Sequence, residues 1–325
     1  MAENSLSQNI NQAISDFNGI KQAIIDKGVE VPTGTPTSQY GAKIGEISGG
    51  GDDESLKAVI EPGSGQVNLP SNLTKIREYA FYNCKNIIIT SLPSGITSIG
   101  SNAFYYCSNI SLKSLSDSIT SIGSYAFFGC TKLALTSLPD GIGSIGSCTF
   151  QNCTNLALTS LPDSITRIGN YAFSGCTKLA LTSLPPNLKS IDDYAFQNCT
   201  NLALTSLPYG ITRIATNVFS GCTKLALTSL PDSVTSISSD AFRNCTNLAL
   251  TSLPNSVKSI GNYVFIRCNK ITTITFEGTP NSIGIYAFNG CTNLTTINVP
   301  WAEGAVSGAP WGATNATINY NYTGN

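Results

Sequence analysis

The amino-acid sequence predicts a solenoid, a fold in which short turns of chain stack along one axis. Ten of the thirteen phenylalanines recur every 23 residues, each three residues before one of ten cysteines that keep the same interval. The ladder cysteines are Cys84, Cys107, Cys130, Cys153, Cys176, Cys199, Cys222, Cys245, Cys268 and Cys291. A fixed period of this size marks stacked units that cannot bury their apolar faces alone. We therefore expect ten stacked turns and not two ordinary domains.

The consensus turn reads AFxxCTxLALTSLPxSITSIGxY, and its length lies within the range typical of leucine-rich repeats. We expect LALTSLP to be a short strand ended by proline, IxxIG a second extended piece, and YAFxxC a helical turn. At the usual strand spacing of about 4.8 Å, ten turns make a rod or shallow arc about 50 Å long, without a deep cleft. The predicted fold class is a leucine-rich-repeat solenoid with short parallel β-strands and short helical turns, preceded by an α-helical segment.

The flanks lie outside this period. We expect residues 1–47 to form a helical attachment or oligomerisation segment, 48–57 a flexible linker, 58–300 the solenoid and 301–325 a cap. Apolar residues at alternating steps of four and three predict a coiled-coil seam, or else one amphipathic helix folded on itself or on residues 31–47. We favour a homo-oligomer, with a trimer as one option. The seam residues are Leu6, Ile10, Ala13, Phe17, Ile20 and Ile24.

Composition argues against several classes of function. Charged residues are 11% of the chain and the net charge is -1, so no basic field exists for nucleic acid. No apolar stretch is long enough to insert into a membrane, and the N-terminus has no readable secretion signal. Histidine is absent, which removes the commonest general base and zinc ligand. We expect a protein that is not an enzyme and needs no cofactor.

The cysteine column predicts core packing in preference to disulfides or metal binding, because it has neither CxxC pairs nor any logic for pairing. Cys148 lies outside that column, in one otherwise filled by Tyr, Asn or Asp, and is expected to be a more exposed thiol without a base to activate it. Both tryptophans, Trp301 and Trp311, follow the last turn. Their simplest role is a lid over the exposed end of the core, and a ligand-stacking platform is the alternative.

Two polar columns suggest chemistry but have simpler explanations. Asp117, Asp140 and Asp163 could bring carboxylates close together for calcium or catalysis, yet aspartate is also favoured at turns. A column of threonines from Thr136 to Thr251 could suggest ice binding, but a solvated β face is simpler.

The turns also alternate between FxGCTK and FxNCTN, a super-period of 46 residues. This alternation indicates copying of a two-turn unit, or else a spacing that keeps Lys132, Lys178 and Lys224 apart.

A few positions depart from the uniform columns and are the candidate contacts for a partner. The residue types there are common in interfaces. These candidates are Arg167, Lys189, Tyr209, Arg213 and Lys258.

The run LTSLPDSITSIGSYAFFGCTKL resembles the Treponema-type, or BspA-like, leucine-rich repeat over about residues 67–300. The segment ISDFNGIKQAIIDKGVEVPTGTPTSQYGAKIGEI, and the tail PWAEGAVSGAPWGATNATINYNYTG, are similar to tail-fibre proteins of Firmicutes phages and prophages. The first resemblance implies adhesion to a surface protein or glycan. The second implies a virion tail protein that recognises a host surface protein or glycan and binds tail or baseplate proteins through its N-terminal segment. The alternative is an adhesin on the bacterial cell surface, and a glycan-cleaving enzyme is the remote one.

Overall fold

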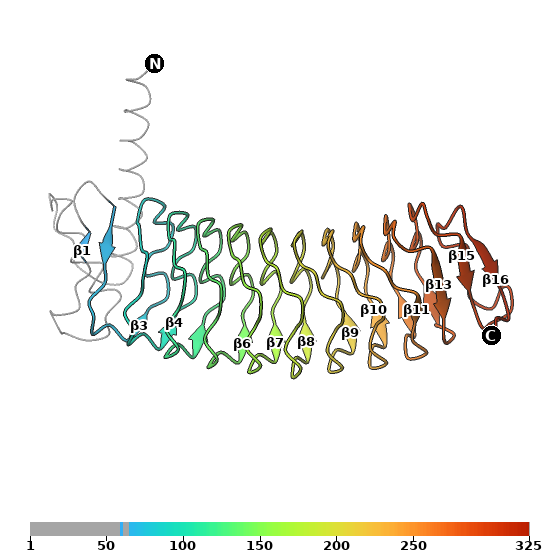
Figure 1. Ribbon diagram of the computed structural model, residues 1–325, viewed down its shortest axis with the longest axis horizontal. Coiled ribbons are helices and arrows are strands. Elements are labelled where there is room, and N and C mark those ends of the chain that lie inside the picture. Colours follow the sequence, from blue (N-terminus) through green and yellow to red (C-terminus); the bar gives the residue numbers. More distant parts are fainter. Residues whose placement is uncertain (1–58, 61–64, 325) are drawn as a thin grey trace, which may run out of the picture.

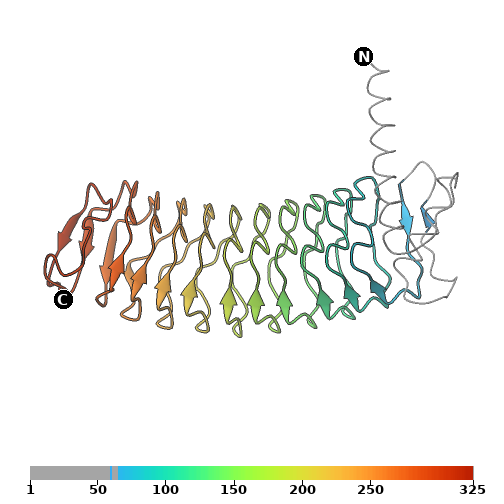
Figure 2. The ribbon, with the colours of Figure 1, turned by 180° about the vertical axis from the view of Figure 1, so that it is seen from behind.

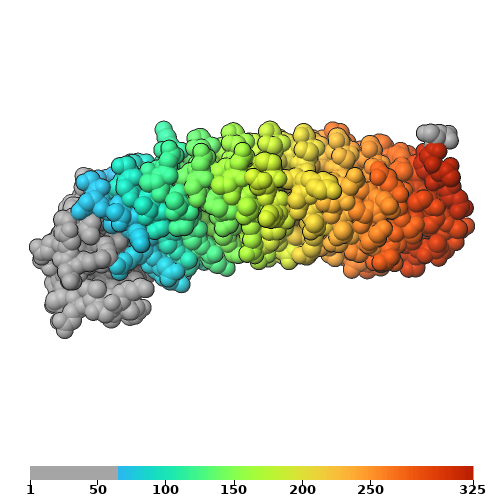
Figure 3. Space-filling model, turned by 90° about the horizontal axis from the view of Figure 1, so that it is seen from below, coloured from blue at the N-terminus to red at the C-terminus, as the bar shows by residue number. Residues whose placement is uncertain are grey.

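The computed structural model describes residues 59–60 and 65–324 and shows an elongated solenoid of about 11 turns (Figure 1). The turns follow one another in sequence order, so the first and last turns lie at opposite ends of the rod (Figure 2). In the space-filling view of Figure 3, the side chains of successive turns pack against one another along the whole length of the rod. The predicted helical segment 1–47 with its seam, and the linker 48–57, lie outside the described residues.

A parallel ladder runs along one side of the solenoid, hereafter the strand side (Figure 1). Each turn contributes two residues, a polar residue that is exposed or half-buried and a buried isoleucine, and isoleucine pairs with isoleucine in register. The ladder has three sections, β3-β4-β5, β6-β7-β8 and β9-β10-β12-β14. Its strands are β3 (Lys75–Ile76), β4 (Ser98–Ile99), β5 (Ser121–Ile122), β6 (Ser144–Ile145), β7 (Arg167–Ile168), β8 (Ser190–Ile191), β9 (Arg213–Ile214), β10 (Ser236–Ile237), β12 (Ser259–Ile260) and β14 (Ser282–Ile283).

The prediction that LALTSLP is a strand is wrong for most turns. In the central turns this segment makes one backbone hydrogen bond to the same segment of the neighbouring turn, such as Ala157 N–H to Leu135 O at 3.1 Å. Thr136 and Ser137 are adjacent and both exposed, which breaks the alternation that a strand requires. The segment becomes a four-stranded parallel sheet near the C-terminus. Those strands are β11 (Ser252–Leu253), β13 (Thr273–Phe276), β15 (Thr296–Asn298) and β16 (Thr317–Asn319).

A short antiparallel pair precedes the first turn. It joins β1 (Val59–Ile60) to β2 (Val67–Asn68). Gln66 forms a parallel bridge with Ile88, and Val67 N–H donates to Ile88 O at 3.0 Å. These bonds attach the pair to the solenoid.

The expected helical turn at YAFxxC is instead a left-handed bend, and the described residues contain no helix. Tyr79 and Asn83 have φ of 57° and 59°, and the same two positions repeat with positive φ along the chain. This geometry aims alternate amides along the solenoid axis. Phe81 N–H donates to Ala103 O at 2.7 Å, and Asn83 N–H to Tyr105 O at 2.6 Å. The side of the solenoid that carries the YAFxxC bends, hereafter the turn side, therefore has its own ladder of hydrogen bonds between turns. A helix would not provide such a ladder, since helical hydrogen bonds close within one segment.

The phenylalanine and cysteine columns form the centre of the core, as predicted. All ten column phenylalanines are fully buried, with successive ring centroids 5.2–5.8 Å apart and nearly parallel planes. The ladder cysteines are free and buried. From Cys107 onward each ladder thiol also donates to a phenylalanine carbonyl 26 residues earlier, as in Cys176 Sγ to Phe150 O at 2.9 Å. Cysteine thus fills the column and satisfies a buried carbonyl oxygen.

The C-terminal tail adds a turn that the period did not predict. Trp311 lies 23 residues after Phe288 and accepts its amide hydrogen bond, Phe288 N–H to Trp311 O at 3.0 Å. Trp301 and Trp311 are both buried against Phe276. The lid interpretation of the tryptophans is confirmed, and the expectation of ten turns is corrected to about 11. In the regular turns the phenylalanine amide donates to the residue 22 positions later, so the carbonyl of Trp311, 23 positions after Phe288, takes the place of an alanine carbonyl and the register shifts by one residue in the tail.

The 46-residue super-period has a packing explanation. A Cβ atom on Gly175 would lie 2.4 Å from Asn152 Oδ1, so the asparagine of one turn fills the space above the glycine of the next. The same relation holds for Asn198 and Gly221. The lysine of one turn also bonds to the asparagine of the turn before it, since Lys224 Nζ donates to Asn201 Oδ1 at 2.6 Å. The side chains of neighbouring turns are therefore complementary in shape, and a repeat built from two-turn units preserves this fit.

Cys148 is buried, with 5% of its surface exposed, so the prediction of a more exposed thiol is wrong. It stands between Tyr125 and Tyr171 in its column, and those larger side chains flank it. Burial raises the pKa of the Cys148 thiol, although a hydrogen bond with Tyr125 opposes the shift. The column position alone could not reveal this shielding.

Candidate binding surface

Four of the five candidate contacts lie in three consecutive turns of the strand side. Arg167 and Arg213 occupy the exposed positions of β7 and β9, where other turns from β4 onward have serine. Lys189 replaces the threonine that precedes a strand, and Tyr209 replaces a turn aspartate in the turn of Arg213. We call Arg167, Lys189, Tyr209 and Arg213 the central strand-side patch.

Lys258 does not belong to this patch. Two turns with threonine at its position, Thr212 and Thr235, separate it from Lys189. Its Nζ donates to Asn255 O at 2.8 Å, within its own turn. The structure thus groups four candidates and leaves the fifth apart.

Arg167 is held by the following turn. Its Nη2 and Nε both donate to Asp192 Oδ2, at 2.6 and 3.1 Å. The arginine side chain stays 61% exposed while the carboxylate is mostly covered. A solvent-exposed ion pair of this kind stabilises the fold by about 0.2–1 kcal/mol. Its main effect is to fix the direction of the guanidinium.

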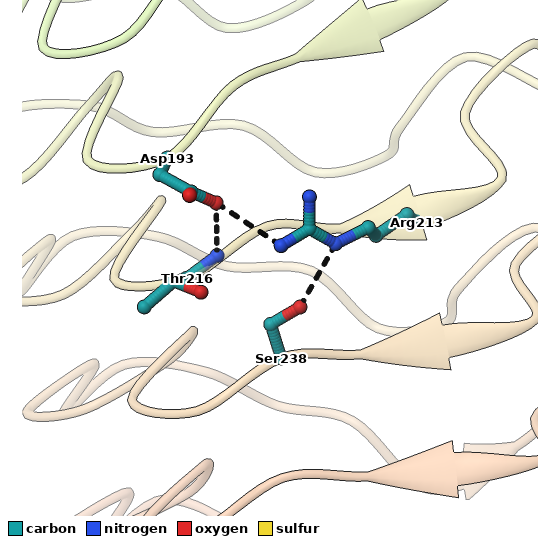
Figure 4. A network of polar contacts seen from close by, with 4 residues as sticks. All are labelled: Asp193, Arg213, Thr216 and Ser238. Atoms are coloured by element: carbon teal, nitrogen blue, oxygen red, sulfur yellow. Dashed lines mark hydrogen bonds and ion pairs between the residues drawn. The ribbon is translucent and has the colours of Figure 1, made fainter.

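Arg213 lies in a second network, drawn in Figure 4. Its Nη2 donates to Asp193 Oδ1 at 3.2 Å, and its Nε to Ser238 Oγ at 3.0 Å. Asp193 Oδ1 also accepts the backbone N–H of Thr216 at 2.9 Å. The guanidinium therefore spans the turns on both sides of its own.

Tyr209 is the most prominent apolar side chain among the described residues, at 75% exposure. Lys189 is also exposed. The phenol of Tyr209 shares a turn with one oriented guanidinium and lies two turns from the other, and these residue types are enriched in protein interfaces. The patch can therefore contact a partner by ring packing and by charge-assisted hydrogen bonds.

Sequence reasoning missed the partners of the two arginines, Asp192 and Asp193. Both depart from their columns, where glycine and serine or asparagine are common. The sequence did hold a signal for these partners, because two adjacent aspartates replace the usual residues of their columns one turn after Arg167 and one turn before Arg213. The period places them in columns, but it does not indicate which side chains reach across turns.

The polar columns are exposed to solvent. Asp117, Asp140 and Asp163 are exposed at their turns, and the threonines from Thr136 to Thr251 are exposed as well. Among the described residues no three His, Cys, Asp or Glu side chains are grouped so that they could hold a metal ion. Two adjoining grooves of about 650 and 300 Å³ lie on the first turns. Serines, threonines and Leu92 dominate their lining, which offers no evident acid–base pair.

The buried thiols are unsuited to nucleophilic chemistry. The pKa values of the Cys153, Cys176 and Cys199 thiols are raised well above the ordinary value, and burial is the main cause. The pKa of Cys291, at the end of the column, is raised to about 11 by burial. Because the thiolate is the reactive form, these groups stay protonated and inert at neutral pH.

Within the part of the chain that the structure describes, no helix has the length and apolar character needed to cross a bilayer.

Comparison with known proteins identifies the repeat. The family model described as BspA type leucine rich repeat region matches residues 64–157, 98–226 and 212–303, which together cover more than half of the chain. No curated protein matches the sequence. A leucine rich cell surface protein from Faecalibacterium prausnitzii A2-165 is 25% identical, with a TM-score of 0.51 over 77% of this chain and 82% of that one. A T. pallidum leucine rich repeat protein is 27% identical over 68% of this chain and 90% of that one, with a TM-score of 0.42.

Proposed function

The chain belongs to the BspA type leucine rich repeat family, and from this we propose that it is a bacterial cell-surface adhesin that binds a partner and does not catalyse a reaction. The observation that carries the proposal is the likeness to the cell surface protein of F. prausnitzii over most of both chains. The central strand-side patch supports it, because a uniform solvated face gives way there to exposed Arg, Lys and Tyr.

The proposed partner is a protein on another cell. Arg167 and Arg213 keep free donor positions beyond the bonds to their aspartates, and their guanidinium groups are already oriented. Oriented side chains lose less entropy on binding than mobile ones do. Tyr209 supplies exposed ring area in the turn of Arg213.

Location is the first test of this proposal. Intact cells of the source strain would be treated with protease, and the released peptides identified by mass spectrometry. Peptides from residues 65–324, released while cytoplasmic marker proteins stay intact, are expected. Detection of the chain only after lysis would contradict a surface role.

The central strand-side patch is tested by substitution with residues that other turns carry at the same positions. A variant with Arg167→Ser, Lys189→Thr, Tyr209→Asp and Arg213→Ser should fold, because neighbouring turns carry these residues at the same positions. We expect binding of the purified protein to partner cells to fall at least tenfold. The matched control is Lys258→Thr, outside the patch, and equal binding by all three proteins would refute the patch.

The tail-fibre hypothesis is a second proposal, which rests on the resemblance of residues 14–47 and of the C-terminal tail to phage proteins. In it the N-terminal segment binds tail or baseplate proteins, the chain forms a homo-oligomer, and the solenoid recognises a host. Proteomics of purified tail particles separates the two proposals. The chain would be recovered in particles under the second proposal, and only in the cell envelope under the first.

A further inference from the structure

A cluster of aromatic side chains lies on the turn side of the first three turns, away from the central strand-side patch. Its rings contact one another across turns, and we call them the tyrosine patch. Its members are Tyr79, Tyr82, Tyr105, Tyr106, Tyr125 and Phe128.

The geometry of the patch is a short stack with a ring set across it. Tyr82, Tyr105 and Phe128 stack in successive turns with centroids 4.8 Å apart and planes within 14° of parallel. Tyr106 stands at 87° to Tyr105 and at 80° to Phe128. A Cβ atom at Gly129 would lie 2.6 Å from the Tyr106 ring, so the glycine makes room for it. The rings are thus held in fixed relative positions.

The repeat provides an internal control for each position. In the column of Tyr82, Tyr105 and Phe128, the next four turns have Gln151, Ser174, Gln197 and Ser220. In the column of Tyr106 the other turns have asparagine, glycine or arginine. Aromatic rings are therefore not needed here for the solenoid to stack. Their gathering in three adjacent turns calls for another explanation.

The patch is exposed and uncharged. Tyr79, Tyr82, Tyr106 and Tyr125 are 38–44% exposed, and large apolar side chains that gather on a surface in this way mark a site of interaction. Burial and the neighbouring phenols raise the pKa of Tyr105, so its hydroxyl stays neutral at physiological pH. Beside the rings, the second and third turns present hydroxyl groups, from Ser101, Ser124 and Thr131.

We propose that the tyrosine patch is a binding site for uncharged glycans, separate from the central strand-side patch. The C–H face of a pyranose ring packs on aromatic rings, while its hydroxyls bond to phenol and serine hydroxyls. Tyrosine offers both an apolar ring and a polar end for this purpose. The rings themselves carry no charge that would pair with a charged glycan, and the exposed charged residues nearest to them in the first turn, Arg77, Glu78 and Lys85, are of both signs. The rigid array also limits the entropy lost when a sugar binds.

The test is an array of uncharged oligosaccharides, made of glucose, mannose and N-acetylglucosamine oligomers, probed with the full chain. Hits would be measured by saturation-transfer NMR. The variant carries Tyr82→Gln, Tyr105→Ser, Tyr106→Asn and Phe128→Ser, all residues that the same columns hold in other turns. We expect its affinity to be at least tenfold weaker, with saturation transfer from the aromatic protons of the protein to the glycan lost.

The matched control carries Tyr171→Asn and Tyr194→Asn, which removes a stacked pair of rings, 4.5 Å apart, that begins two turns after the tyrosine patch ends. It should bind like the unchanged protein. Equal losses in control and variant, no binding to any uncharged glycan, or binding to proline-rich peptides alone would each overturn the proposal. The variant keeps the central strand-side patch, so its partner-cell binding through that patch tests the adhesin proposal separately.

Discussion

The inner and outer columns of the solenoid repeat with the same step but tolerate very different changes. Inside, all ten ladder positions from Phe81 to Phe288 keep phenylalanine, and the cysteine column is equally uniform. Outside, the serine positions of β7 and β9 carry arginine without any change in the ladder register. An inner side chain must match the turns on both sides, whereas an outer one faces water. Departures in the outer columns are therefore where binding functions can arise.

The largest expected effect comes from the inner thiols at alkaline pH. Burial raises the pKa of nine ladder thiols, from Cys107 to Cys291, while thiols of the unfolded chain ionise near pH 8.5. Above that pH the folded state holds more protons, so stability falls as pH rises, by about 1.4 kcal/mol per unit for each thiol. Urea unfolding at pH 7, 9 and 10 should show a free energy of unfolding that falls steeply as the pH rises above about 8.5.

Cys176→Ala provides the control for this effect. Although the variant starts less stable, its slope with pH should be smaller by about one thiol's contribution, 1.4 kcal/mol per unit. An unchanged slope would mean that the thiols are not the groups responsible.

The contrast between inside and outside is tested directly by two single changes. Phe173→Ala removes a fully buried ring from the middle of the stack and should cost about 3–5 kcal/mol. Thr182→Ala changes an exposed side chain and should stay within about 0.5 kcal/mol. Denaturant unfolding of both variants measures these losses. Similar losses of stability would contradict the assignment of Phe173 to the inside and Thr182 to the outside.

An intermediate effect is expected where neighbouring turns meet at the super-period. Gly175→Asn places a Cβ atom against Asn152 Oδ1 and should cost about 1–3 kcal/mol by overpacking. Adding Asn152→Gly should restore part of this loss, because it removes the group that clashes. A double-mutant cycle with unfolding free energies measures the coupling. Additive effects would show that the alternation reflects copying alone.

A smaller difference is expected between the two tryptophans of the last turn. Trp311 Nε1 donates to Ser307 O at 2.8 Å, whereas the buried Nε1 of Trp301 has no hydrogen-bond partner among the described residues. Trp311→Phe should therefore destabilise the protein by about 1 kcal/mol more than Trp301→Phe does. Thermal unfolding of both variants measures the difference, and the reverse order would contradict the hydrogen-bond assignment.

The sequence by itself determined the solenoid, its 23-residue step, the burial of the Phe and Cys columns and the exposure of the Thr column. Each of these follows from the period and from side-chain hydrophobicity. Tertiary structure alone decided that the ladder lies at the Ser-Ile and Arg-Ile positions, that Cys148 is buried and that the tail adds a turn. It also decided that Arg167 and Arg213 reach Asp192 and Asp193, and that six aromatic rings meet on the turn side. A period defines which residues share a column, but the path of the backbone around each turn decides which columns touch. That path depends on left-handed residues such as Tyr79 and Asn83 and on contacts between turns.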